Sequence, residues 1–368
     1  MKRSRFLMFE LEKGIGAAQL SLFNGIALAM LLNVTAVLPK FYTFFDERGQ
    51  RRHPDEPESH AYVPMDYFFD VDAFVQALKP MVRVVPSLPV ALQQFAREET
   101  KQEAHFINPL LWSNELPKFV DHFHMHNVLV LGSLAKKLVW NTPQLAQLRT
   151  LLHGALRPSE RVSRYANHVQ MGIQAFAKRK NLPQSYVSLQ LPSGPEWTEY
   201  CRQQQLSEQV ADFRACDLPT EGVVQVLEER QVGELSRLLY VATGMLSGAQ
   251  LQLLHQQRFI VITKSRFTLD IQPDIANAVD IQVCKESSLF VGNLFSSFSF
   301  LQREAKLVAG QVERASYYNL DVDLPFDDLT KEEALRWDVL PFSATRGPTG
   351  AGMGAPSEGA AHAHGGEL

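Results

Sequence analysis

Apolar runs of strand length alternate with helical patterns from the start of the chain. Residues 6–11 predict a strand, and residues 13–18, "KGIGAA", predict a turn that carries two glycines. Residues 19–33 predict a helix, because apolar side chains recur there every three or four positions. A second strand is expected over residues 35–38, before a proline. This β-turn-α-β unit indicates a parallel sheet with a right-handed crossover.

The same alternation continues through the rest of the chain. A helix over residues 67–78 has Asp70 or Asp72 as its N-cap, and a long helical region ends near residue 180. The remaining strands are expected over residues 82–85, 127–133, 186–191, 239–243, 259–263 and 288–291. The pattern therefore predicts an α/β protein made of two halves that join near residue 180.

Composition narrows the class of protein. The chain has 368 residues, of which 45% are hydrophobic and 21% charged, as expected for about two globular domains. A net charge of −4 gives no electrostatic reason to expect a nucleic-acid partner. Residues 346–368 are rich in Gly and Ala without an apolar period, so we expect this tail to be disordered.

The sequence shows no membrane span and no recognisable signal peptide. The basic start is followed by an apolar run of only residues 6–9, which is too short for a signal peptide. The longest apolar stretch, residues 25–32, is too short to cross a bilayer and predicts a buried helix. The compartment is therefore not readable from these residues.

Two glycine- or serine-bearing turns are candidates for binding an anion. Gly14 and Gly16 lie between a predicted strand and helix, where backbone N–H groups can approach a phosphate or a sugar. These glycines can equally serve only the tight bend. Further along, Ser296, Ser297 and Ser299 follow a predicted strand and open a predicted helix, a place that suits a diphosphate. The alternative is capping serines beside a core phenylalanine, Phe298.

Histidines offer a weaker hypothesis of metal binding. His122, His124 and His126 would share one face of an extended segment, but no Cys or Glu partner is obvious. His362 and His364 lie in the predicted disordered tail. We interpret all of them as surface or packing residues and expect no metal.

An ordered set of motifs resembles the GDP-fucose protein O-fucosyltransferase family, particularly its plant and algal branch. The motifs are "GIGAAQLSLFNGIALAMLLNVTAVLPKF", "YFFDVDAFVQALKPMVRVVPSLP", "LLYVATG" and "AVDIQVCKESSLFVGNLFSSFSFLQRE". Their order and spacing hold from about residue 6 to residue 310. No single motif is decisive, but the ordered set is fairly specific.

The resemblance implies a GT-B-like fold, in which two Rossmann-like domains face each other across a cleft. It implies an acceptor-side domain over residues 1–180 and a nucleotide-sugar domain over residues 181–340. The donor would be GDP-fucose or a related nucleotide sugar, bound without a required metal by Gly14, Gly16, Asp280, Ser296, Ser297, Phe298 and Ser299. The acceptor would be a hydroxyl of a protein or glycan. The family also implies the Golgi or secretory pathway.

One motif departs from the family. The stretch "YVSLQLPSGPEWTEYC" resembles its "H-x-R-x-E-x-D-W…C" segment when aligned on Trp197 and Cys201. Gln190 then occupies the position of the family's histidine, and Pro192 that of the arginine that contacts the donor phosphates. Proline carries no charge and donates no hydrogen bond. The catalytic residues of this chain are therefore unknown from sequence.

Two functions remain open on these grounds. The first is a glycosyltransferase, with Lys264 or Arg303 as possible replacements for the missing cation. The second is a non-catalytic relative that keeps the fold as a nucleotide-binding, glycan-binding or partner protein.

The cysteines Cys201, Cys216 and Cys284 have no metal-site spacing and allow one disulfide. From matched family positions we expect Cys201 and Cys284 to lie close together.

Overall fold

The computed structural model describes most of the two predicted halves. The described residues are 5–46, 48, 50, 52, 61–93, 127–132, 142–192, 195–206, 216–242, 246–267 and 271–319. The histidines at 122, 124 and 126 and the tail over residues 346–368 lie outside them, so the expectations for these segments stay predictions.

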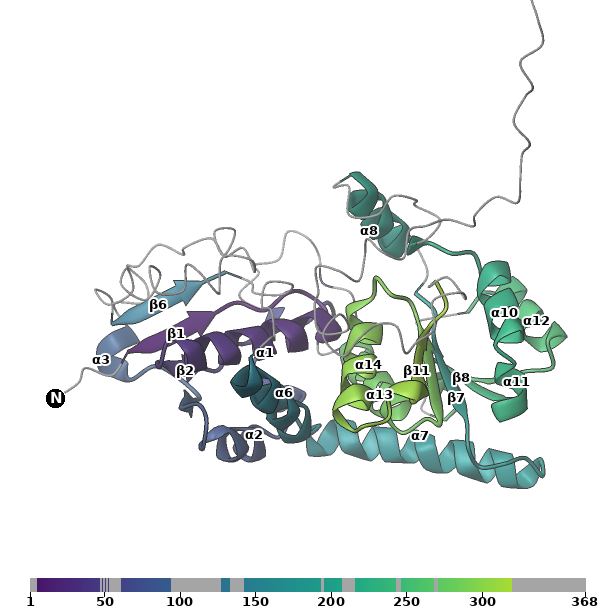
Figure 1. Ribbon diagram of the computed structural model, residues 1–368, viewed down its shortest axis with the longest axis horizontal. Coiled ribbons are helices and arrows are strands. Elements are labelled where there is room, and N and C mark those ends of the chain that lie inside the picture. The colour runs from purple at the N-terminus through teal and green to yellow at the C-terminus, as the bar shows by residue number, and fades with distance from the viewer. Residues whose placement is uncertain are drawn as a thin grey trace, which may run out of the picture.

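The first half is built on a four-stranded parallel sheet with the order β5-β2-β1-β6 (Figure 1). The strands are β1 (Phe6–Phe9), β2 (Thr35–Val37), β5 (Val84–Val85) and β6 (Val128–Leu131). Each of the four lies within a segment that the apolar pattern predicts as a strand. A separate antiparallel hairpin joins β3 (Phe41–Tyr42) to β4 (Tyr62–Val63), ahead of the short helix η2 (Met65–Tyr67).

Helix α1 (Ile15–Leu31) starts earlier than the sequence predicts. The expected turn over residues 13–18 is largely the first turn of the helix. Gly14 allows this because it adopts a φ of 91°, a conformation that favours glycine, and its carbonyl accepts the N–H of Ala18 at 2.8 Å. The expectation for α2 (Val71–Leu78) is confirmed, since the Asp70 carboxylate caps it by accepting the N–H of Ala73 at 2.9 Å.

The second half is built on a five-stranded parallel sheet with the order β11-β10-β7-β8-β9. Its strands are β7 (Val187–Gln190), β8 (Leu238–Ala242), β9 (Ile260–Ile262), β10 (Leu289–Gly292) and β11 (Ala315–Tyr317). The pattern predicts the first four and misses β11. After α2, the helices within the described residues are α3 (Val90–Gln93), α6 (Pro143–Ala155), α7 (Glu160–Arg179), α8 (Pro195–Leu206), α10 (Thr220–Glu229), α11 (Val232–Leu235), α12 (Gly248–Gln256), η5 (Lys264–Arg266), α13 (Pro273–Lys285), α14 (Ser297–Val308) and η6 (Val312–Arg314).

Helices α1, α6, α13 and α14 pack together between the two sheets (Figure 1). One hydrophobic cluster runs through this junction and includes Ile26 of α1 together with Val279 of α13. Near it, Arg149 of α6 pairs with Glu304 of α14 at 3.2 Å, and both side chains are at most 10% exposed. Burial raises the pKa of Glu304, while the neighbouring arginine lowers it. Apolar burial and a buried ion pair therefore join the two halves.

A second polar contact links the halves at the start of α13. The carboxylate of Asp274 accepts the backbone N–H groups of Phe44 at 3.3 Å and Phe45 at 3.1 Å. Burial raises the pKa of Asp274, and these two hydrogen bonds lower it. The hydroxyl of Tyr67 donates to Gln272 beside it. The loop after β3 is thus held against the second half.

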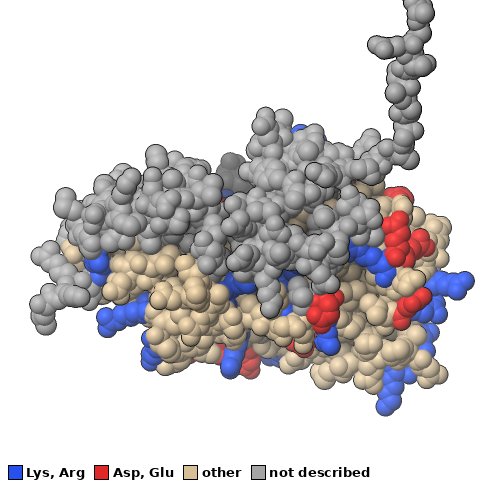
Figure 2. Space-filling model, in the orientation of Figure 1, with Lys and Arg blue, Asp and Glu red and all other residues tan. Residues whose placement is uncertain are grey.

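The described surface carries both signs of charge on the face shown in Figure 2. None of the described helices is long and apolar enough to cross a membrane.

Candidate nucleotide-sugar site

Two helix starts meet where the halves join. An ideal Cβ placed on Gly16, in the first turn of α1, would lie 3.0 Å from the backbone N of Phe298 and 3.1 Å from Oγ of Ser297. Both of those residues belong to the first turn of α14. Gly16 and Ser297, which the resemblance places in one donor site, therefore lie side by side.

Neither of these helix starts has a side-chain cap among the described residues. Gly14 precedes α1 without a side chain, and Ser296 precedes α14 without a capping hydrogen bond from its hydroxyl. The first N–H groups of a helix have no partner within the helix, and the helix dipole makes that end favourable for an anion. Two such ends side by side suit a diphosphate better than either end alone.

The serines differ in what they can offer to a ligand. Ser299 is fully buried, and its hydroxyl donates to Oε1 of Gln190 at 2.9 Å and accepts the N–H of Asn293 at 3.0 Å. Ser297 is only partly buried and borders Gly16. The ring of Phe298 packs on Phe290 of β10, with centroids 6.2 Å apart. Ser299 thus positions the loop before α14, whereas Ser297 lies at the meeting of the two helix starts.

The carboxyl end of β7 faces the same helix. Gln190 is its last residue, is 9% exposed, and contacts Ser299 through the hydrogen bond above. Pro192 follows two residues later and is partly exposed. Gln190 is therefore engaged with α14, and Pro192, which the resemblance aligns with the family's arginine, carries no charge.

Asp280 and Lys264 form a buried ion pair instead of lying open to a ligand. The Lys264 ammonium, just after β9, donates to one carboxylate oxygen of Asp280, and the hydroxyl of Tyr240 from β8 donates to the other. The carboxylate of Asp280 is 4% exposed and the lysine side chain 13%. Burial raises the pKa of Asp280, and Lys264 opposes that rise. Both groups would have to exchange these partners before they could contact a donor.

The other candidate cation also has neighbours inside the second half. Arg303 lies on α14, is 4% exposed, and places its guanidinium over the ring of Tyr317 at 5.5 Å from the centroid. Tyr317 belongs to β11. The arginine is thus packed against the sheet, and its use in binding a diphosphate stays a proposal.

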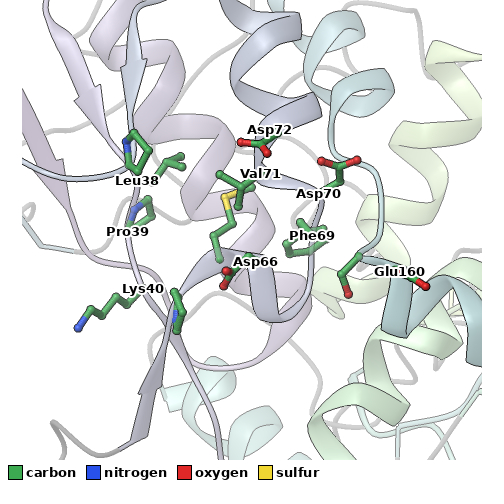
Figure 3. Close-up of a pocket in the computed structure, with 13 residues that line it drawn as sticks. Leu38, Pro39, Lys40, Asp66, Phe69, Asp70, Val71, Asp72 and Glu160 are labelled. Atoms are coloured by element: carbon green, nitrogen blue, oxygen red, sulfur yellow. The ribbon is translucent and has the colours of Figure 1, made fainter.

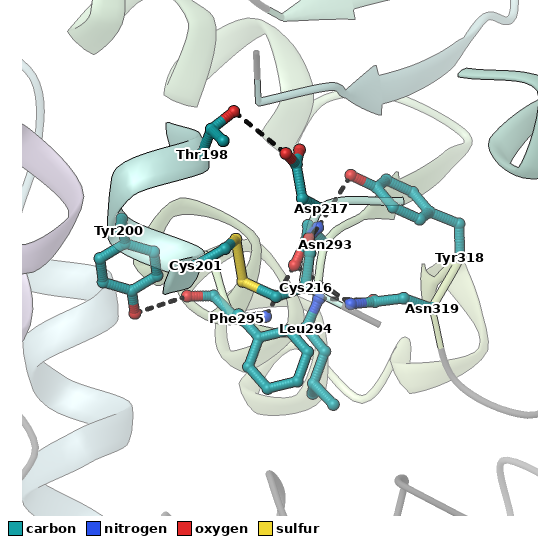
Figure 4. The surroundings of a disulfide bond; sticks show 10 residues. All are labelled: Thr198, Tyr200, Cys201, Cys216, Asp217, Asn293, Leu294, Phe295, Tyr318 and Asn319. Atoms are coloured by element: carbon teal, nitrogen blue, oxygen red, sulfur yellow. Dashed lines mark hydrogen bonds between the residues drawn. A yellow bond between two sulfur atoms is a disulfide. The ribbon is translucent and has the colours of Figure 1, made fainter. Parts of the chain in front are cut away.

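A disulfide between Cys201 and Cys284, which the resemblance expects to lie close together, does not form. Cys201 of α8 is bonded to Cys216, with their Cα atoms 5.6 Å apart (Figure 4). Cys284 is a free buried cysteine on α13. The physical reason is that Cys284 belongs to the core at the junction of the halves, whereas the disulfide packs with Trp197, Tyr200 and Phe295. Burial raises the pKa of the Cys284 thiol above the ordinary range.

The disulfide supports the loop that leads into α14. The side chain of Asn293, at the end of β10, donates to the carbonyl of Cys216 at 2.8 Å and to the Tyr318 hydroxyl at 3.1 Å (Figure 4). Tyr200 of α8 donates to the carbonyl of Phe295 at 3.2 Å. Sequence reasoning did not select Asn293, although the asparagine after a buried strand was a signal of such a turn. The start of α14 is therefore held from two sides.

We expect loss of this disulfide to lower stability. With a sequence separation of 15 residues, replacement of Cys201 and Cys216 by alanine should lower the free energy of unfolding by about 3 kcal/mol. Urea unfolding measures this change. Treatment of the unmodified protein with a reductant should reproduce the loss and leave the double variant unaffected. A reductant without effect on the unmodified protein would contradict the pairing.

No metal cluster is found in the described part of the chain, where no three His, Cys, Asp or Glu side chains gather to hold an ion.

Comparisons with known proteins agree with the architecture. A family model described as GDP-fucose protein O-fucosyltransferase matches residues 6–308. No curated protein sequence matches. A crystal structure of POFUT1 in complex with GDP is similar, with a TM-score of 0.57 at 16% identity over 86% of this chain and 99% of that chain. A crystal structure of POFUT1 in complex with GDP-fucose gives 0.57 at 15% identity, over 86% and 98%.

The fold is thus α/β and GT-B-like, as the resemblance implies. Because the family match covers most of the chain, from β1 to the end of α14, the protein belongs to the GDP-fucose protein O-fucosyltransferase family of glycosyltransferases.

Proposed function

We propose that this chain binds a GDP-sugar, with its diphosphate at the two helix starts formed by Gly16 and Ser297, and transfers fucose or a related sugar to a hydroxyl. The observation that carries this proposal is the contact between those helix starts. Membership of the family and the GDP-fucose bound in the related POFUT1 structure support a guanosine donor. The donor would lie against the domain over residues 181–340, and the acceptor against that over 1–180.

In this reaction the acceptor hydroxyl oxygen attacks the anomeric carbon and gives up its proton to water, and the bond from that carbon to the diphosphate breaks. The diphosphate leaves with the electron pair, so negative charge develops on it. Helix N-termini stabilise that charge, but a positioned arginine typically adds a factor of about 10²–10⁵ in rate. Pro192 removes that contribution, so we expect slow transfer.

A panel of nucleotides tests the donor. Thermal unfolding is measured with GDP, UDP, GDP-fucose and GDP-mannose, because a ligand that binds only the folded state raises its stability. We expect GDP and GDP-fucose to stabilise the protein and UDP to have no effect. If no nucleotide stabilises it, the donor site proposed here is wrong.

The non-catalytic alternative has its own observation in favour. Gln190 is engaged with Ser299, and Lys264 is paired with Asp280, so neither side chain is available as a cation or base for the donor in this arrangement. Stabilisation by GDP without release of fucose from GDP-fucose, with or without acceptors, would support this alternative over transfer.

We expect a Gly16→Ala substitution to weaken binding of GDP by about tenfold or more, because displacement of a binding group by a fraction of an ångström is costly. The added methyl would lie 3.0 Å from the Phe298 backbone N, closer than ordinary contact, and would push the helix starts apart. Isothermal titration with GDP measures the effect. The matched control is Gly154→Ala in α6, where a Cβ meets nothing within 4 Å. Equal affinities for both variants would argue against a diphosphate beside Gly16.

We assign the protein to the secretory pathway, with which its family is associated. The disulfide between Cys201 and Cys216 supports this assignment, because disulfides persist in oxidising compartments.

A further inference from the structure

A cavity lies in the first half, away from the serine segment. It has a volume of about 550 Å³ and is bordered by the residues that follow two neighbouring strands, Leu38 and Pro39 after β2 and Pro86 after β5 (Figure 3). The segment from Pro64 to Asp72 and the start of α7 complete its wall. Ligands of parallel α/β sheets bind outside the carboxyl ends of the strands, which is where this cavity lies.

The rim of this cavity is strongly acidic. Asp66, Asp70, Asp72 and Glu160 border it and are all exposed, whereas Lys40 is the one cation among the described residues that line it. Figure 3 shows Lys40 on the opposite side of the cavity from Asp70, Asp72 and Glu160. No ion pair joins Lys40 to a carboxylate within the described residues. Within the described residues, no ion pair offsets the charge of the four carboxylates.

The floor of the cavity is apolar. Pro39, Met65 and Phe69 are buried beneath the rim, with Val71 beside them. An anionic sugar nucleotide would be repelled by the four carboxylates, and a neutral glycan would gain no charge complementarity from them. Lysine and arginine side chains match both features, because each has an aliphatic stem for an apolar surface and a cationic head for a carboxylate.

We propose that this cavity binds a lysine- or arginine-bearing segment of a protein, with the aliphatic stem on Met65 and Phe69 and the cationic head at Asp66 and Asp72. Asp70 contributes less to binding the cationic head, because its carboxylate caps α2 by accepting the N–H of Ala73. The site is distinct from the two helix starts, and its occupation does not depend on sugar transfer.

Fluorescence anisotropy with a short labelled peptide of alternating basic and apolar residues tests the proposal on the full chain. The test variant combines Asp66→Asn with Asp72→Asn, which removes two charges from the rim. Its matched control combines Glu228→Gln with Glu234→Gln, two exposed carboxylates of the second half. We expect the test variant to bind the peptide at least tenfold more weakly and the control to bind it as the unmodified protein does. Binding should weaken between about 0.05 M and about 0.3 M salt.

Three outcomes would overturn the proposal: no binding of the basic peptide by the unmodified protein, equal weakening in the control variant, or equal binding of a peptide in which glutamates replace the basic residues. Thermal unfolding of each variant shows that it is folded, and all substituted side chains are exposed. GDP binding measured on the same samples separates this result from the proposed donor site. The test variant should bind GDP unchanged.

Discussion

The combined substitution Gln190→His and Pro192→Arg should raise the turnover of GDP-fucose by at least about 100-fold, because an arginine on a departing diphosphate typically contributes factors of about 10²–10⁵. The two positions close β7 next to α14, since Gln190 accepts the Ser299 hydroxyl at 2.9 Å. A histidine nitrogen can accept the same hydrogen bond, so the loop before α14 need not rearrange. Release of fucose from GDP-fucose, with and without acceptors, measures the gain.

The matched control replaces Pro192 by methionine in the presence of the same Gln190→His change. Methionine is long and flexible but carries no charge, so it separates the effect of the cation from that of losing proline. We expect the control to match the unmodified protein. Equal rates for the arginine and methionine variants would show that the cation is supplied elsewhere, and Arg303 would then be the next residue to replace.

The strands could be predicted from sequence where apolar residues run together. Residues 127–133 and 259–263 contain β6 and β9, because buried parallel strands read as short apolar runs. Strand β11 was missed because its three residues, Ala315–Tyr317, show no such run. It becomes a strand through pairing with β10, where Phe290 lies opposite Ala315. That pairing depends on tertiary contacts that no local pattern contains.

The candidate site was predictable in its location and less so in its contacts. The family resemblance assigned the glycine turn and the serine segment to one donor site, and Gly16 does lie against Phe298. The roles of individual side chains depend on partners distant in sequence. Ser299 is engaged by Gln190, 109 positions away. Such contacts follow from the packing of α14 on the sheet, and spacing within one motif does not indicate them.

The disulfide partner of Cys201 could not be predicted for the same reason, because it also depends on how distant segments pack. Three cysteines allow three pairings, and the resemblance pointed to Cys201 with Cys284. Which two cysteines pair is decided by the face of its helix that each cysteine occupies. Cys284 lies on the buried face of α13, and Cys201 on the face of α8 that packs on Phe295.

Loss of Lys264 should destabilise the protein because it leaves the buried carboxylate of Asp280 without its cation. We expect Lys264→Met to lower the free energy of unfolding by about 3–5 kcal/mol near neutral pH, as for other broken buried ion pairs. Methionine keeps most of the aliphatic stem, so the loss reports on charge. Addition of Asp280→Asn should recover most of it, because the asparagine needs no cation and can still accept from the Tyr240 hydroxyl. Urea unfolding measures both changes.

The pKa of Asp280 determines how the loss of stability in Lys264→Met changes with pH. Burial raises the pKa of Asp280, and the Lys264 ammonium lowers it, so removal of the ammonium raises that pKa further. A carboxyl whose pKa is higher in the folded than in the unfolded protein loses stability as the pH rises through the folded value. The loss of unfolding free energy in Lys264→Met should therefore be larger at about pH 8 than at about pH 5.

The control is Lys178→Met on the exposed end of α7, where we expect a change within about 0.5 kcal/mol at either pH. If Lys264→Met costs no more than this control yet abolishes turnover of GDP-fucose, Lys264 serves the donor instead of Asp280, and the buried pair described here is wrong.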